Sequence, residues 1–135
     1  MKMSIMMVLL MMVPALAQAH VGDHDAPVVV SAPQGGMLKN FGELMVEAVV
    51  QDKTARLYVY DLKLKPRDLA GIKVSASVVK PKSKVELRLP LQNKGGFLVC
   101  DFSTEAKGLH RFTLRVAIDD PKTKHVGRVD FTIEP

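Results

Sequence analysis

The chain has 135 residues, of which 47% are hydrophobic and 24% are charged, and its formal net charge is +5 at pH 7. This length allows one small domain with a single hydrophobic core. Its one cysteine excludes an internal disulfide. Its two tyrosines and five phenylalanines do not interleave with a basic stripe, which argues against nucleic-acid binding.

The first 19 residues are predicted to be a cleaved signal peptide. Lys2 gives a positive start, and an unbroken apolar run covers residues 5–13. Small residues precede two cleavage points, after Ala17 and after Ala19. The apolar run is too short to be a stable membrane anchor. We therefore expect an exported, periplasmic protein that begins near His20, without the six methionines of the signal peptide.

Residues 20–32 are predicted to be a flexible leader that contains the strongest candidate for a metal site. Two histidines and two aspartates lie within six residues: His20, Asp23, His24 and Asp25. Cleavage after Ala19 would let the free amine and the imidazole of His20 chelate one ion, with His24 or an aspartate completing the site. Cleavage after Ala17 would keep the cluster but remove the amine. Neutral imidazole suits copper and zinc. The alternative is a solvated leader with incidental histidines.

Residues 33–135 are predicted to form one all-β domain. Apolar residues recur at every second position, which is the period of a strand and not of a helix. Seven or eight antiparallel strands at this spacing predict a β-sandwich of immunoglobulin-like architecture, or a small barrel. The expected strands cover 44–51, 55–60, 73–79, 85–90, 97–102, 110–118 and 126–133, with 28–30 as an optional first edge strand.

Two further histidines fall in the expected strands. His110 and His125 each share the parity of the apolar face of their strand. A hairpin around Pro121 would place His125 opposite Ile118 and His110 at the far end of the pair. Because the two side chains would then lie far apart, a shared metal site is not expected. We predict two strand-end histidines with satisfied hydrogen bonds.

No pattern of residues indicates catalysis. The chain has no nucleophile elbow, no P-loop, no H-E-x-x-H motif and no cysteine pair. Cys100 is expected to be a buried structural thiol, because nothing near it in the sequence would activate it. A reactive thiol or soft metal ligand is the alternative. We therefore do not expect an enzyme.

Several short motifs carry a resemblance to a known group of proteins. The leader H-V-G-D-H-D of residues 20–25 resembles the H-E-G-H-D-H openings of small exported bacterial proteins of heavy-metal systems. Residues 32–36, 43–50 and 57–61 are similar to the P-H-G-G, V-E-L-V and L-Y-V-Y-D motifs of those proteins and of periplasmic adaptor subunits of heavy-metal efflux pumps. Gln34 stands where that pattern has histidine. The resemblance covers residues 20–76.

The resemblance implies a periplasmic metal-binding accessory protein. Such a protein would capture or deliver copper or zinc near a heavy-metal efflux system, with a periplasmic subunit of the pump as its partner. His20 and His24 would be the ligands, and Asp23 and Asp25 would be secondary ones. The alternative is a metal-independent scaffold module, in which an edge strand or loop face of the sandwich binds a protein partner.

Overall fold

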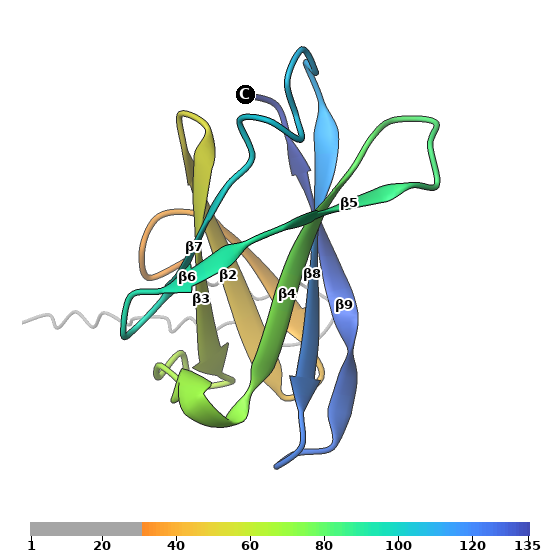
Figure 1. Ribbon diagram of the computed structural model, residues 1–135. Helices are drawn as coiled ribbons and strands as arrows, with labels where there is room; N and C mark the ends of the chain where they lie inside the picture. The colour runs from red at the N-terminus through yellow and green to blue at the C-terminus, as the bar shows by residue number, and fades with distance from the viewer. Residues whose placement is uncertain (1–30) are drawn as a thin grey trace, which may run out of the picture. The chain divides into compact units, whose positions relative to one another are not determined.

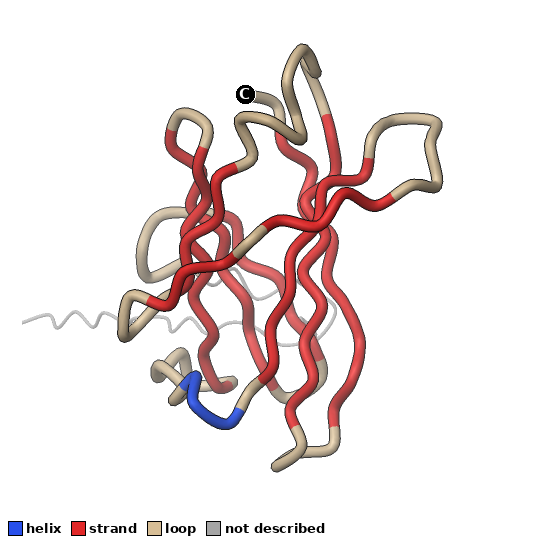
Figure 2. Tube along the Cα trace, viewed as in Figure 1, coloured by secondary structure: helices blue, strands red, loops and turns tan. Residues whose placement is uncertain are grey.

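The protein is a β-sandwich. A computed structural model describes residues 31–135, which form two antiparallel sheets facing one another (Figure 1). Strands dominate the described chain, and its one helical segment is a single 3-10 turn (Figure 2). No helix in residues 31–135 is long and apolar enough to cross a membrane. The predicted all-β, antiparallel sandwich is confirmed, whereas the predicted signal peptide and most of the leader lie outside the described residues.

The nine strands divide between a five-stranded and a four-stranded sheet. In spatial order, the five-stranded sheet contains β1 (Met37–Phe41), β2 (Leu44–Gln51), β3 (Thr54–Asp61), β7 (Leu98–Asp101) and β6 (Leu91–Asn93). The four-stranded sheet contains β5 (Glu86–Leu89), β4 (Lys73–Val79), β8 (Phe112–Asp120) and β9 (His125–Ile133). The 3-10 turn η2 (Leu69–Gly71) precedes β4.

The count of nine exceeds the predicted seven or eight for two reasons. β1 has no clear period-two pattern because it is an edge strand with mostly exposed side chains. Pro90 separates β5 from β6, which belong to different sheets. Proline has no N–H for a strand ladder, so the chain leaves one sheet there and joins the other. The optional strand at 28–30 lies outside the described residues.

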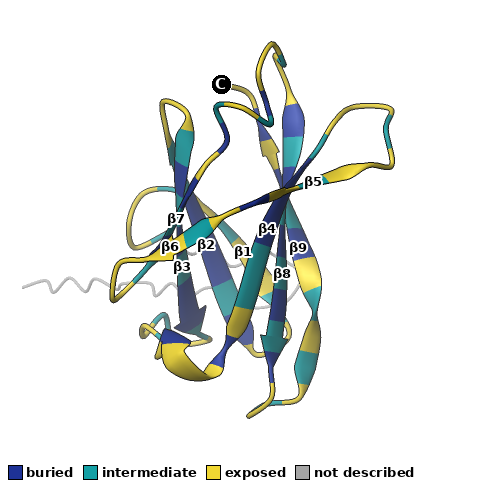
Figure 3. Cartoon of the chain, in the orientation of Figure 1, coloured by how far each residue is buried: buried dark blue, intermediate teal, exposed yellow. Residues whose placement is uncertain are grey.

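The core fills the space between the sheets and follows from the period-two pattern. Burial alternates along the whole of β8, where every second residue from Phe112 to Asp120 is buried (Figure 3). Phe102, Phe112 and Phe131 are the largest side chains in the interior. The rings of Phe102 and Phe112 lie 5.0 Å apart between centroids, at an interplanar angle of 57°. One apolar face from each sheet therefore makes a single core.

A buried ion pair joins two loops at one end of the sandwich. Asp120, 1% exposed, accepts a 3.1 Å hydrogen bond from Arg67 in the β3–β4 connection. It also accepts hydrogen bonds from the N–H of Lys122 and the hydroxyl of Thr123 in the β8–β9 turn. Burial alone would raise the pKa of Asp120, but these hydrogen bonds and the Arg67 charge outweigh it and hold the pKa below its usual range.

Replacing Asp120 by asparagine should lower the free energy of unfolding by about 2 kcal/mol at pH 7, because an amide cannot pair with Arg67 and has one acceptor oxygen. The folded pKa lies below the unfolded value of about 3.9, so this stabilisation is present above that pH and is lost as the pH falls through the folded pKa. Urea unfolding near neutral and acidic pH measures the difference. The exposed Asp52→Asn is the control, and an equal Asp120→Asn penalty at both pH values would contradict the prediction.

Candidate functional site

The predicted metal ligands His20, Asp23, His24 and Asp25 all lie outside the described residues. The structure therefore neither brings them together nor separates them. Within residues 31–135, no group of three or more histidine, cysteine, aspartate or glutamate side chains could hold a metal ion. The part of the chain that the structure does describe contains another unusual feature, which lies where the leader joins the sandwich.

Glu47 is a fully buried carboxylate on the outer face of the five-stranded sheet. The inward positions of β2 are apolar, so alternation turns Glu47 away from the core. Its Oε1 accepts a 2.6 Å hydrogen bond from the hydroxyl of Tyr60, and its Oε2 accepts a 2.7 Å bond from the N–H of Gly36. The N–H of Gln34 lies 3.1 Å from both oxygens. We call these residues, with the turn from Ala32 to Gly36, the Glu47 clamp.

Glycine is required at two positions of the turn that covers Glu47. Gly35 has φ of +77°, a backbone conformation that other residues rarely adopt, and its N–H bonds the carbonyl of Ala32 at 3.0 Å. A Cβ on Gly36 would overlap the carbonyl oxygen of Ala48, so the backbone lies directly on β2. The two glycines thus let backbone N–H groups approach the carboxylate closely enough to bond it.

The charge environment of the clamp is unusual because hydrogen-bond donors surround the carboxylate without a cation. Among residues 31–135, no lysine or arginine forms an ion pair with Glu47. Burial of Tyr60 and its hydrogen bond to Glu47 raise the pKa of the Tyr60 hydroxyl, which therefore stays protonated and remains a donor. Donors of this kind can stabilise a buried carboxylate in place of a counter-ion.

Sequence reasoning missed the clamp. The alternation along β2 predicts that Glu47 faces outward, and an outward glutamate is normally solvated. The available signal was a single acid in an otherwise apolar strand, L-M-V-E-A-V-V, preceded by a Gly-Gly turn. The three motif segments at 32–36, 43–50 and 57–61 meet at this carboxylate, since they contain Gly36, Glu47 and Tyr60 respectively.

An aromatic strip lies beside the clamp on the same outer face. Tyr58 stacks parallel to Tyr60 with ring centroids 6.3 Å apart, and it packs against Phe97 at 5.2 Å. The guanidinium of Arg56 lies over the Phe97 ring, 6.0 Å from its centroid. Tyr58, Phe97 and Arg56 are each only partly buried. This arrangement offers flat apolar contact next to a cation.

The two histidines of the sandwich do not share a site. The register of the β8–β9 hairpin decides how far apart the two histidines lie. It pairs His125 with Asp120 and Ile118 with Gly127. The predicted pairing of His125 with Ile118 is therefore wrong by two residues, because the turn starts only after Asp120. His110 is exposed and precedes β8.

The expected hydrogen bonding of His125 is also wrong in one respect. Its Nε2 is buried and has no partner within the described residues. The ring meets the edge of Phe41 at a centroid distance of 6.3 Å, and a Cβ on Gly42 would press against it. The His125 ring on β9 therefore packs against Phe41 and Gly42 of the β1–β2 turn through van der Waals contacts and not through hydrogen bonds of Nε2.

Cys100 is a buried thiol, and its burial agrees with the prediction. It is 1% exposed in the core, and its Sγ lies 3.7 Å from the carbonyl oxygen of Ala55. Burial raises the pKa of the thiol to about 11. At neutral pH the thiolate needed for nucleophilic attack or soft-metal binding is therefore scarce.

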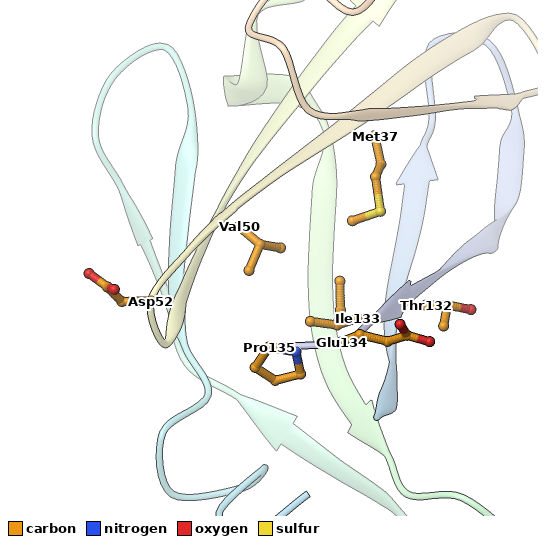
Figure 4. Close-up of a pocket in the computed structure, with 7 residues that line it drawn as sticks. All are labelled: Met37, Val50, Asp52, Thr132, Ile133, Glu134 and Pro135. Carbon is orange, nitrogen blue, oxygen red and sulfur yellow. The ribbon is translucent and has the colours of Figure 1, made fainter. Parts of the chain in front are cut away.

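An open groove of about 480 Å³ lies where β1 and β2 approach the end of β9 (Figure 4). Met37, Val50 and Ile133 give it an apolar lining. The Asp52 carboxylate points away from these three side chains (Figure 4), and Glu134 pairs with Arg111 at 3.4 Å in solvent. Because its polar groups do not converge, the groove has no arrangement that suits catalysis.

Comparison with known proteins finds no matching family model, no matching curated protein and no matching solved structure.

The Glu47 clamp should contribute measurably to stability. Glu47→Gln is expected to lower the free energy of unfolding by about 2 kcal/mol, because an amide has one acceptor oxygen where the carboxylate has two. When that oxygen accepts from the backbone N–H groups of Gln34 and Gly36, the Tyr60 hydroxyl loses its acceptor, and the remaining bonds are no longer charge-assisted. Tyr60→Phe should cost about 1 kcal/mol, and the double variant should cost less than the sum, since both changes remove the same bond. Chemical denaturation measures all three.

The matched control for this prediction is Glu43→Gln, which changes an exposed glutamate in the neighbouring turn. It should alter stability by less than about 0.5 kcal/mol. If Glu47→Gln and Glu43→Gln had the same effect, the clamp would not stabilise the fold.

Proposed function

We propose that the protein is an exported, non-enzymatic accessory protein whose leader binds copper or zinc. The observation that carries the proposal is the cluster of His20, Asp23, His24 and Asp25 at the expected new N-terminus. Histidines and an N-terminal amine are good ligands for both metals. The resemblance to small exported proteins of heavy-metal systems supports the same assignment.

In this proposal, the sandwich carries the leader and does not itself bind the metal. The Glu47 clamp holds the chain at Gln34 and Gly36, about ten residues after His24. In this proposal the leader supplies the ligands that exchange the ion, and the clamp holds the chain that follows the leader. Capture of an ion, or its delivery to a periplasmic subunit of a heavy-metal efflux pump, fits such an arrangement.

Titration of the exported protein with Cu²⁺ and with Zn²⁺ tests the proposal. The double variant His20→Ala/His24→Ala should bind at least about tenfold more weakly, whereas His110→Ala, which removes an exposed histidine of the sandwich, should bind like the wild type. Affinity should also fall as the pH drops below about 6, because imidazole binds metal only in its neutral form. Wild-type binding no tighter than that of the double variant would overturn the proposal.

The role of the N-terminal amine needs its own arm of the experiment. Mass measurement of the exported protein fixes the cleavage point. If His20 is the first residue, a Gly-Ser extension in front of it should weaken copper binding, because the amine moves away from the His20 imidazole. An unchanged affinity would show that the amine is not a ligand and would leave the side chains as the only donors.

A second candidate function is a metal-independent interaction module. The partly exposed Tyr58, Phe97 and Arg56 on the outer face of the five-stranded sheet favour it, because aromatic residues and arginine are the residues most enriched at the centres of protein interfaces. Removal of metal ions with EDTA distinguishes the metal-binding function from the metal-independent interaction module. A metal carrier loses its activity when the ion is removed, whereas an interaction module keeps its partner.

A further inference from the structure

The two outer faces of the sandwich differ in chemistry. On the four-stranded sheet, Arg115 lies between two carboxylates: it bonds Asp130 through two nitrogens and Glu86 through a third. Its charge is therefore satisfied within the chain. On the five-stranded sheet, the aromatic strip of Tyr58 and Phe97 occupies the middle of the face. The outer face of the four-stranded sheet is therefore mainly charged, whereas the outer face of the five-stranded sheet is aromatic at its centre.

Arg56 is the cation that lies beside this aromatic strip. Among residues 31–135 the Arg56 guanidinium forms no ion pair. The flat face of the guanidinium lies over the Phe97 ring, so the N–H groups at its edge remain available as donors. An arginine held on an aromatic ring at this position can therefore bond a carboxylate that comes from outside the chain.

The same face carries a carboxylate that could supply this partner. Asp101 is exposed on β7, and the β3–β7 register places it opposite Thr54, while Arg56 lies opposite Val99. Asp101 is thus one row away from Arg56, on the adjacent strand. Its carboxylate accepts the N–H of Ser103 and forms no ion pair within the described residues. Beside an apolar strip, the face therefore presents one cation and one anion that form no ion pair within the described residues, and the charge of Lys53 in the β2–β3 turn also acts on Asp101.

We propose that this face is the interface of a two-fold symmetric homodimer. In a two-fold interface, a residue that contacts a second residue of the partner is matched by the reverse contact. A face with Arg56 and Asp101 on adjacent strands is complementary to itself: Arg56 of each copy faces Asp101 of the partner subunit, and the Tyr58 and Phe97 rings pack at the centre. A single-sign face would instead repel its own copy.

The area of this face limits the affinity that we expect for the dimer. The five strands contain 28 residues. At about 3.4 Å per residue and about 4.8 Å between strands they cover roughly 450 Å² per copy, part of it under the turn that covers Glu47, which is well below the roughly 800 Å² of a standard interface. The dimer should therefore dissociate in the micromolar range. This inference rests on the second candidate function and names its partner, and it does not depend on metal binding.

Analytical ultracentrifugation of the full protein in EDTA, over a range of concentrations around the micromolar, tests the dimer. The wild type should change from monomer to dimer as concentration rises. Arg56→Glu should raise the dimer dissociation constant at least about tenfold, because each copy then faces Asp101 of the partner subunit with a like charge. Arg56→Glu/Asp101→Arg should restore the dimer, since the pair is reversed and not removed.

Arg128→Glu is the matched control, because it makes the same change on the exposed edge strand of the other sheet. It should leave the dimer intact. A wild type that stays monomeric, an Arg128→Glu variant as weak as Arg56→Glu, or a double variant without rescue would each overturn the proposal.

If a variant fails to fold, concentration-dependent NMR shifts of the wild type test the proposal instead: they must map to the outer face of the five-stranded sheet. Metal titration is unaffected by any of these results, so failure here is distinguishable from failure of the metal proposal.

Discussion

The buried carboxylate of Glu47 is the constraint on which the N-terminal part of the sandwich depends. A carboxylate removed from water without a cation must be surrounded by donors, and two of its donors are backbone N–H groups that precede β1. These N–H groups belong to the turn of residues 32–36, which therefore lies against the Glu47 side chain immediately before β1. The clamp thus sets where β1 begins, and β1 in turn packs beside β9 through Phe41 and Gly127.

The period-two pattern predicts most of the strands because their inward-facing apolar side chains are buried in the core. The inward faces of β2, β3, β4 and β8 are mostly apolar, with Asp120 at the end of β8 as a charged exception, so the sequence pattern alone identifies those strands. β1 and β6 are not predicted, because these edge strands bury few side chains and therefore show no clear alternation in sequence. The exact hairpin register is not predicted either, since the length of the β8–β9 turn depends on Asp120, whose carboxylate bonds Lys122, Thr123 and Arg67.

Glu47 shows why the clamp could not be predicted from the same pattern. Alternation correctly assigns its side chain to the outer face, but it contains no information about what covers that face. Coverage comes from a turn more than ten residues earlier in the chain, and it depends on a non-local contact between Gly36 and Ala48. The sequence therefore predicts the direction of the side chain, and only the tertiary structure determines its burial.

The clamp also bears on residue 34, where the motif of the proposed resemblance has a histidine. Gln34 contributes only its backbone N–H to Glu47, and its side chain is exposed. A histidine at this position, as in the P-H-G-G pattern, would therefore keep the hydrogen bond to Glu47, because the backbone N–H and not the side chain is the donor. A histidine there would add an exposed imidazole at the root of the leader and leave the fold unchanged. Under the proposed metal-binding function, the residue at position 34 would therefore affect how many possible ligands lie beside the leader and would not affect its attachment to the sandwich.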